Sequence, residues 1–261
     1  GVFANYEHVS LAMDAVGYLY LAYNNYDTSS TGEAKMEVRQ SLIPYDVVSW
    51  KTPRIVDSLI GITNFEPVIA VDGAIGAGGL KASVAYLDAR TANSGVLYTL
   101  EEDGNWNLGT WSGSASVELN ADTTSTVGIM TPDMDYDAGG DLYVIWADDR
   151  DVASNYKLYG NYSNDGGVTI SSAGEVQISE AGANIQEKPK LATGPNPGDL
   201  AIAYIRENAS LDINPYVLYR SLDFFDACNV DPGSSGYWDS WSGVSLDPNN
   251  YLSAPSSYQF N

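Results

Sequence analysis

The feature that most constrains this fold is a unit that recurs four times, about every 60 residues. Each unit holds a short strand, a turn and a strongly apolar second strand that contains an aromatic residue. These aromatic residues are Tyr23, Tyr86, Trp146 and Tyr204, which lie 63, 60 and 58 residues apart. Since one such unit cannot cover both of its own faces, the copies are expected to stack on one another.

Three strand-like segments are recognisable in every unit. The second strands occupy residues 18–27, 81–90, 141–150 and 199–208, and the strands before them occupy 8–14, 67–72, 132–137 and 188–193. The third strands read KMEVRQS, GVLYTLE, KLYGNYS and YVLYRSL. No segment sustains a helical period, and Gly, Asn and Asp bound the apolar runs. The pattern predicts an all-β fold, a β-propeller of four-stranded blades with four repeats visible; a β-sandwich of irregular strands is the alternative.

The repeats also suggest how the chain is divided. We expect propeller repeats over 1–230, with blades at about 7–60, 66–120, 130–180 and 186–230. Residues 231–261 break the pattern and are rich in Ser, Pro, Gly and aromatic residues. They are expected to form a C-terminal extension, either as extra strands or an extra blade or as the start of a following β module. A fragment of a larger multidomain parent is a further interpretation.

The charge balance limits the partners. Acidic residues outnumber basic ones 34 to 12, which gives a net charge of −22. Such a surface repels phosphate backbones, so we expect no nucleic acid partner. No apolar run reaches the ~20 residues that a membrane helix needs, so no membrane insertion is expected. The sequence has a single histidine and a single cysteine, which argues against a His-based zinc site and against a Ser-His-Asp triad.

One turn carries a recognisable motif. The third repeat continues as Ser-Asn-Asp-Gly-Gly-Val-Thr-Ile over residues 163–170. This segment resembles the Asp-box, S-x-D-x-G-x-T-W, of sialidase-type propellers (the BNR-repeat family), with Ile170 in place of Trp. The residues that match are Ser163, Asp165, Gly167 and Thr169, and the fourth repeat has a partial match at Ser221 and Asp223. In this motif the carboxylate accepts backbone hydrogen bonds within a hairpin, so it stabilises the fold and has no catalytic role.

The resemblance also indicates where a ligand would bind. In propellers of this family, the loops between second and third strands lie on the ligand face. The candidate residues there are Asp27, Asp88, Arg90, Asp148, Asp149, Arg150, Asp151, Arg206 and Glu207. Such a ring of carboxylates and guanidiniums suits a sugar or a cation; solvated ion pairs at the strand ends are the alternative. Exo-sialidases use three arginines, a Tyr/Glu pair and an Asp, but no such set can be assigned from this sequence.

A second acidic cluster has spacing typical of calcium loops. Asp133, Asp135, Asp137 and Asp141 stand at positions 1, 3, 5 and 9 of one segment. Oxygen ligands at alternate positions can surround one Ca²⁺ if the chain turns tightly. Ca²⁺ is therefore the one cofactor predicted; an ordinary strand and turn is the alternative.

Together these features predict an exported protein, located outside the cell or at its surface. We expect a sialidase-like propeller that acts as a binding or scaffolding module for a glycan or an extracellular protein. A sialidase-like glycoside hydrolase, or a lyase, is one alternative. A structural subunit that self-assembles into a surface layer or filament is another.

Overall fold

The computed structural model of the chain describes residues 5–26, 33–60, 66–72, 80–88, 94–102, 117–119, 130–148, 156–167, 169–170, 175–178, 185–207, 213–220 and 242–245.

These residues form four antiparallel sheets of four strands each. Sheet 1 contains β1 (Asn5–Met13), β2 (Leu19–Tyr26), β3 (Glu33–Gln40) and β4 (Arg54–Ile60). Sheet 2 contains β5 (Val68–Val71), β6 (Leu80–Asp88), β7 (Ser94–Glu102) and β8 (Val117–Glu118). Sheet 3 contains β9 (Met130–Tyr136), β10 (Leu142–Asp148), β11 (Lys157–Ser163) and β12 (Val176–Gln177). Sheet 4 contains β13 (Ile185–Thr193), β14 (Leu200–Glu207), β15 (Ile213–Arg220) and β16 (Ser242–Ser245).

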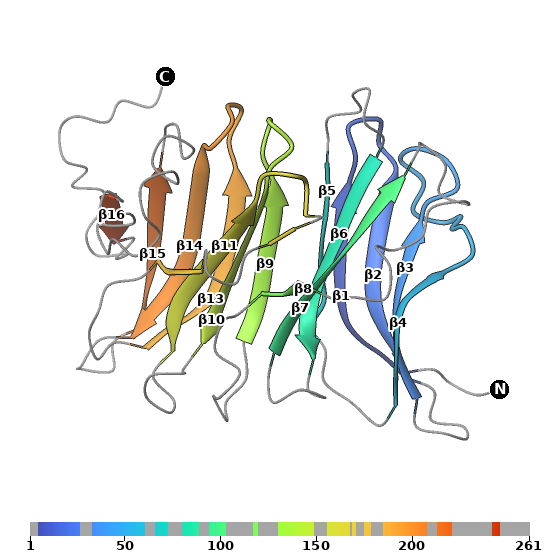
Figure 1. The fold of residues 1–261 in the computed structure, drawn as a ribbon, viewed down its shortest axis with the longest axis horizontal. Helices are drawn as coiled ribbons and strands as arrows, with labels where there is room; N and C mark the ends of the chain where they lie inside the picture. Colours follow the sequence, from blue (N-terminus) through green and yellow to red (C-terminus); the bar gives the residue numbers. More distant parts are fainter. Residues whose placement is uncertain are drawn as a thin grey trace.

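The sheets stand side by side in chain order, with sheet 1 and sheet 4 at opposite ends of the row (Figure 1). Within each sheet the strands follow one another in sequence order. The first strands β1, β5, β9 and β13 contact one another in succession. They therefore form the inner edge of the stack, as expected for blades of a propeller.

Buried apolar side chains fill the space between consecutive sheets. Tyr20 and Met36 of sheet 1 pack with Val84 and Tyr86 of sheet 2. Sheets 2 and 3 share a second core that is centred on Trp146, and sheets 3 and 4 share a third. Strands β10 and β11 are buried almost along their whole length, because sheet 3 has a neighbour on each side. Apolar runs rather than strict alternation mark such strands.

An aspartate fixes the tight turn between the first and second strands. The Asp14 carboxylate accepts the N–H groups of Val16 and Tyr18, at 3.0 and 2.8 Å, and the Tyr20 hydroxyl, at 3.2 Å. In sheet 3, Asp137 occupies the same place and accepts the N–H groups of residues 139 and 141 and, at 3.5 Å, the hydroxyl of residue 143. The recurring acid after the first strand is therefore a turn residue that also binds the second strand.

The structure confirms the all-β propeller arrangement expected from the repeats. The four recurring aromatic residues are all buried, with exposed fractions of 3% for Tyr23, 0% for Tyr86, 0% for Trp146 and 5% for Tyr204. Strand β16, which completes sheet 4, lies inside residues 231–261, the segment that the repeat pattern set apart. Among the described residues, no helix has the length and apolar character needed to cross a membrane.

Candidate functional site

The predicted ligand face lies at the edge of the sheets opposite the Asp14 and Asp137 turns. Since β2, β6, β10 and β14 run antiparallel to the inner strands, all four end at this edge. Asp88 is the last residue of β6, Asp148 the last of β10, and Arg206 and Glu207 the last two of β14. Residues Asp27, Arg90, Asp149, Arg150 and Asp151 lie outside the described residues. The strand ends thus bring the predicted candidates of several repeats to one edge.

Asp148 is the one candidate at this edge whose side chain the structure describes. It is 1% exposed, and its partner in the register of the neighbouring strand is Lys157, which is 5% exposed. A charged group buried to this degree is stable only with compensating partners. Asp148 is therefore suited to holding the start of the loop that follows it, while residues 149–151 remain the predicted contacts for a ligand.

Three of the four aspartates of the predicted calcium segment bind protein groups through their side chains. Asp133, Asp135 and Asp137 line one side of β9 and the turn after it, and each contacts sheet 4. The Asp135 carboxylate accepts the backbone N–H and the hydroxyl of Thr193, at 3.0 and 2.9 Å. The Asp137 carboxylate accepts the N–H of Gly198 at 2.7 Å. Asp141 closes the turn through its backbone.

These contacts make the segment a connection between two sheets. Among the described residues, no group of three or more His, Cys, Asp or Glu side chains is placed to hold a metal ion. Sequence spacing placed Asp133 and Asp135 on one face of a strand, as the structure has them. It could not show that the backbone of a strand some 58 residues later supplies their partners. Calcium binding stays a prediction.

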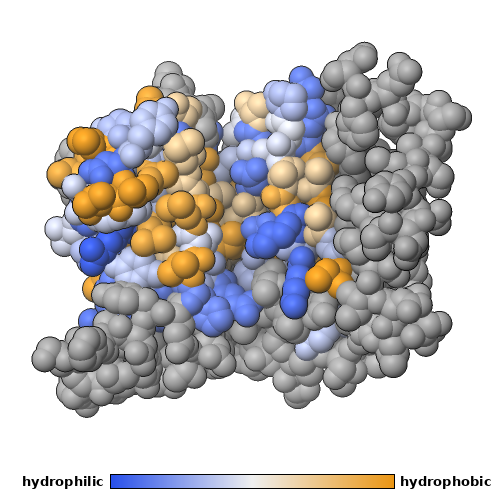
Figure 2. Space-filling view, turned by 180° about the vertical axis from the view of Figure 1, so that it is seen from behind, coloured by the Kyte–Doolittle hydropathy of each residue, from blue (hydrophilic) through white to orange (hydrophobic). Residues whose placement is uncertain are grey.

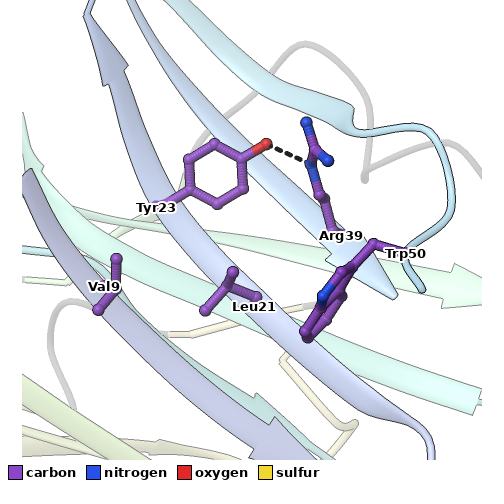
Figure 3. A pocket seen from close by; sticks show the side chains of 5 residues that line it. All are labelled: Val9, Leu21, Tyr23, Arg39 and Trp50. Atoms are coloured by element: carbon purple, nitrogen blue, oxygen red, sulfur yellow. Dashed lines mark hydrogen bonds between the residues drawn. The ribbon is translucent and has the colours of Figure 1, made fainter. Parts of the chain in front are cut away.

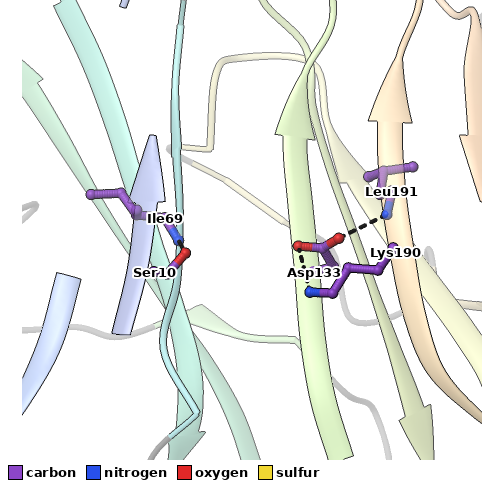
Figure 4. Close-up of polar contacts among 5 residues, drawn as sticks. All are labelled: Ser10, Ile69, Asp133, Lys190 and Leu191. Carbon is purple, nitrogen blue, oxygen red and sulfur yellow. Dashed lines mark hydrogen bonds and ion pairs between the residues drawn. The ribbon is translucent and has the colours of Figure 1, made fainter. Parts of the chain in front are cut away.

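Asp133 shows how the connection works (Figure 4). Its carboxylate accepts the Leu191 N–H at 2.8 Å and lies 3.6 Å from the ammonium group of Lys190. Burial raises the pKa of Asp133, although the hydrogen bond from Leu191 and the charge of Lys190 act in the opposite direction. Ser10 has the equivalent role between sheets 1 and 2. Its hydroxyl accepts the Ile69 N–H at 3.1 Å, as the Asp133 carboxylate accepts the Leu191 N–H.

The hairpin after β11 has the local geometry expected for residues 163–170. The Asp165 carboxylate accepts the Thr169 N–H at 2.9 Å and the hydroxyl groups of Thr169 and Ser163, at 2.5 and 2.6 Å. The Ser163 hydroxyl in turn accepts the Gly167 N–H at 2.7 Å. Gly167 has a φ of 92°, which other residues rarely adopt, and Ile170 is buried in the core between sheets 2 and 3. Ser221 and Asp223 lie outside the described residues.

Sheet 1 carries a hydrogen-bonded group of three polar side chains, Tyr23, Glu37 and Arg39, that the sequence analysis did not predict. The Tyr23 hydroxyl donates to the Glu37 carboxylate at 2.8 Å and accepts the Arg39 Nε–H, also at 2.8 Å. Burial, followed by the hydrogen bond to Glu37, raises the pKa of Tyr23 well above its usual range, so this tyrosine stays protonated. The signal that could have indicated this group is the alternation of side chains along β3, which puts Glu37 and Arg39 on the same face of the sheet as Tyr23.

A shallow hollow of about 330 Å³ opens beside this group. Its lining consists of Val9, Leu21, Tyr23, Arg39 and Trp50, and is mostly apolar (Figure 3). Trp50 comes from the connection between β3 and β4, while the other four residues come from β1, β2 and β3. The hollow lies on the side of sheet 1 that faces away from sheet 2, and not at the predicted ligand edge.

Comparisons with known proteins identify the fold. Neither a family model nor a curated protein sequence matches the chain. Among solved structures, the chain is similar to the Penicillium chrysogenum α-L-arabinanase complexed with arabinobiose, with 14% identity and a TM-score of 0.54 over 92% of this chain and 66% of that one. It is also similar to a Fusarium graminearum α-L-arabinofuranosidase, with 14% identity and a TM-score of 0.54 over 94% of this chain and 71% of that one.

A third similar structure is a Hadza microbial sialidase, with 17% identity and a TM-score of 0.52 over 82% of this chain and 44% of that one. The chain thus spans about two thirds of the arabinanase and less than half of the sialidase. At these identities the likeness establishes a shared fold, the β-propeller.

Proposed function

We propose that this chain is a carbohydrate-binding part of a β-propeller, and that it binds a neutral glycan at the edge where β2, β6, β10 and β14 end. The observation that carries the proposal is the convergence of these strand ends, each of which ends in, or is soon followed by, acidic or arginine residues. Carboxylates accept hydrogen bonds from sugar hydroxyls, and guanidiniums donate to sugar oxygens. The similarity to arabinanase, arabinofuranosidase and sialidase structures supports the ligand class.

Charge favours a neutral glycan over an anionic one. The net charge of −22 repels a sialic acid carboxylate, and the whole chain holds only 12 lysines and arginines. A pentose oligomer such as arabinobiose, the ligand in the arabinanase structure, carries no charge. Arabino-oligosaccharides are therefore the first ligands to test, with sialyllactose as the anionic comparison.

Hydrolysis is the second candidate function, since the similar structures include glycoside hydrolases. Glycosidases need two carboxyl groups about 5–10 Å apart across the scissile bond. Apart from the buried Asp148, the acids of the predicted face that could form such a pair are Asp27, Asp88, Asp149, Asp151 and Glu207. Self-assembly as a surface subunit is the third class, and it is compatible with glycan binding.

The hairpin at 163–170 belongs to the same proposal. The hydrogen bonds that Asp165 and Ser163 make support its assignment as an Asp-box of the sialidase type. We likewise propose that residues 1–230 form the propeller repeats and that the protein is exported, because glycan polymers of this kind lie outside the cell.

Calorimetric titration with arabino-oligosaccharides, alongside sialyllactose, tests the function. Asp149→Asn, at the predicted face, should weaken binding at least tenfold through loss of a charged acceptor, about 1.4 kcal/mol or more. The matched control is Asp46→Asn, on the exposed 42–49 loop that meets the opposite edge near Gly17. Measuring released reducing ends in the same samples separates binding from hydrolysis. Equal loss in both variants, or no binding of either sugar, would refute the proposal.

A further inference from the structure

Each internal sheet packs through two distinct faces. We call the face toward the preceding sheet the front face and the face toward the following sheet the back face. The front face contains cross-strand pairs such as Ile69–Val84 in sheet 2 and Met134–Val144 in sheet 3. All four residues are buried, with exposed fractions between 0 and 4%. Front-to-back packing occurs three times in this chain, between sheets 1 and 2, 2 and 3, and 3 and 4.

Sheet 1 has the same apolar front face, but no described sheet covers it. The register places Leu11 opposite Leu21, which corresponds to the Ile69–Val84 and Met134–Val144 pairs. Leu11 is 59% exposed, although its counterparts Ile69 and Met134 are each only 4% exposed. Val9 and Met13, its neighbours on the same side of β1, are 64% and 54% exposed.

These residues form one continuous patch with the hollow beside Tyr23. Figure 2 shows hydrophobic side chains gathered over the sheet 1 end of the molecule. Ile55, which is 50% exposed, extends the patch onto β4, since it stands opposite Glu37 in the register. An exposed patch that repeats the composition of three buried interfaces marks an interaction surface.

Sheet 4 presents the complementary half of the same interface. On the second strands of sheets 1, 2 and 3, the back-face residues paired with Ser10, Val68 and Asp133 are Ala22, Ala85 and Ile145. Each of these three is at most 2% exposed. The corresponding residue of sheet 4 is Ala203, opposite Lys190, and it is exposed. Ala192, on the same strand as Lys190, is exposed as well. Among the described residues, the stack therefore has an open front face on sheet 1 and an open back face on sheet 4.

We propose that copies of this chain associate head to tail, with the front face of sheet 1 in one copy packed on the back face of sheet 4 in the next. This contact repeats the front-to-back packing that the chain already makes three times. The interface is heterologous, because each copy contributes a different surface. Such a contact builds a closed ring if the rotation between copies completes a circle, and an open filament if it does not.

The polar groups at the two surfaces are compatible with this contact. Ser10, Val68, Asp133 and Lys190 occupy the same register position on the first strands of the four sheets. Ser10 and Asp133 each accept an N–H from the following sheet. Val68 cannot accept one, yet sheet 2 still shares a buried core with sheet 3. Lys190 of sheet 4 therefore needs no such hydrogen bond. Its ammonium group already lies beside Asp133, so its charge is compensated. The net charge of −22 opposes association, so added salt should strengthen it by screening.

Sedimentation velocity over a concentration series tests the association. The wild-type chain should form species heavier than the 28.0 kDa monomer, more so in 0.5 M than in 0.05 M salt. Leu11→Asp and Ala203→Asp each introduce a charge into one half of the interface, and each should weaken association at least 30-fold, since burying an unpaired charge costs about 2 kcal/mol or more. Ala138→Asp, at an exposed residue in the turn between β9 and β10 of sheet 3, is the matched control and should associate like the wild type.

Mixing the two interface variants gives the sharper result. In a mixture, the intact sheet 1 of Ala203→Asp can pair with the intact sheet 4 of Leu11→Asp, so dimers should form but nothing larger. Association of Ala203→Asp alone would indicate a sheet 1 to sheet 1 contact and overturn the proposal. A wild-type chain that stays monomeric at every concentration and salt would also overturn the proposal. The front face of sheet 1 would then pack against a sheet that does not come from another copy. Unchanged circular dichroism of the variants shows that each is folded.

Discussion

Replacing Asp137 by alanine removes one carboxylate that holds both a turn and two neighbouring sheets. Its side chain is 4% exposed and accepts three backbone N–H groups, from Gly139, Asp141 and Gly198, at 2.7–3.0 Å. Each buried donor left without an acceptor costs about 1–3 kcal/mol. Since two of the three lie in a turn that water can reach, we expect a loss of about 3–5 kcal/mol in the free energy of unfolding.

The measurement is thermal and urea unfolding with added Ca²⁺ and with EDTA. A loss of that size lowers the melting temperature by roughly 10 °C in a chain of this length. Asp137→Asn keeps one acceptor oxygen and should lose about half as much. Because the carboxylate is engaged by protein donors, both losses should be the same in Ca²⁺ and in EDTA. A wild-type protein that Ca²⁺ stabilises, together with a variant that it does not, would refute this reasoning and restore the calcium prediction.

Two further predictions follow from the same structure. Burial raises the pKa of Asp133, so the folded state binds a proton more readily than the unfolded chain, and stability is lost as the pH rises from the unfolded pKa through the raised one. In urea titrations, the unfolding free energy of the wild type minus that of Asp133→Asn should therefore fall as the pH rises above 3.8, the ordinary pKa of an aspartate, and a difference that rises would contradict the assignment. Gly17 and Gly140 occupy equivalent turns with φ of 95° and 85°. An added Cβ at Gly17 would lie 2.4 Å from the ring of Tyr45, whereas at Gly140 the nearest atom would be Asp72 Oδ2 at 3.4 Å, an ordinary contact. Gly17→Ala should then lower the melting temperature more than Gly140→Ala, which costs about 1 kcal/mol, and equal losses would show that backbone strain alone decides both.

The repeats made most of the fold predictable from sequence. A large apolar side chain at the same place in each unit, such as Tyr86 or Trp146, has to be buried between sheets, and the spacing of these side chains fixes the stacking order. The hairpin around Asp165 was also predictable, since its hydrogen bonds join residues that are at most four positions apart. Local chemistry of this kind does not depend on the rest of the chain.

Features that depend on contacts between sheets were not predictable. The acids at 133, 135 and 137 alternate as strand residues do, and this spacing suits a metal site and a contact with the next sheet equally well. Only the position of Leu191 and Thr193 decides between them. Extra strands were among the expectations for residues 231–261, but the place of β16 in sheet 4 could not be predicted, because its partner β15 precedes it by more than twenty residues and its own sequence, SGVS, has little strand character.

The front face of sheet 1 illustrates the same limit. Leu11 and Leu21 look like core residues in the sequence, as Ile69 and Val84 do. Periodicity alone cannot show that one pair lies at the end of the stack and the other inside it. Burial identifies the difference, and the difference is what makes this face an interaction surface.

Hydrogen–deuterium exchange with and without an arabino-oligosaccharide tests the proposed glycan edge most directly. If a glycan binds where the second strands end, exchange should slow in the segments 27–32, 89–93, 149–155 and 208–212. Exchange at the turns of Asp14 and Asp137, on the opposite edge, should not change. Slower exchange at those turns instead, or no change anywhere at saturating oligosaccharide, would contradict the account.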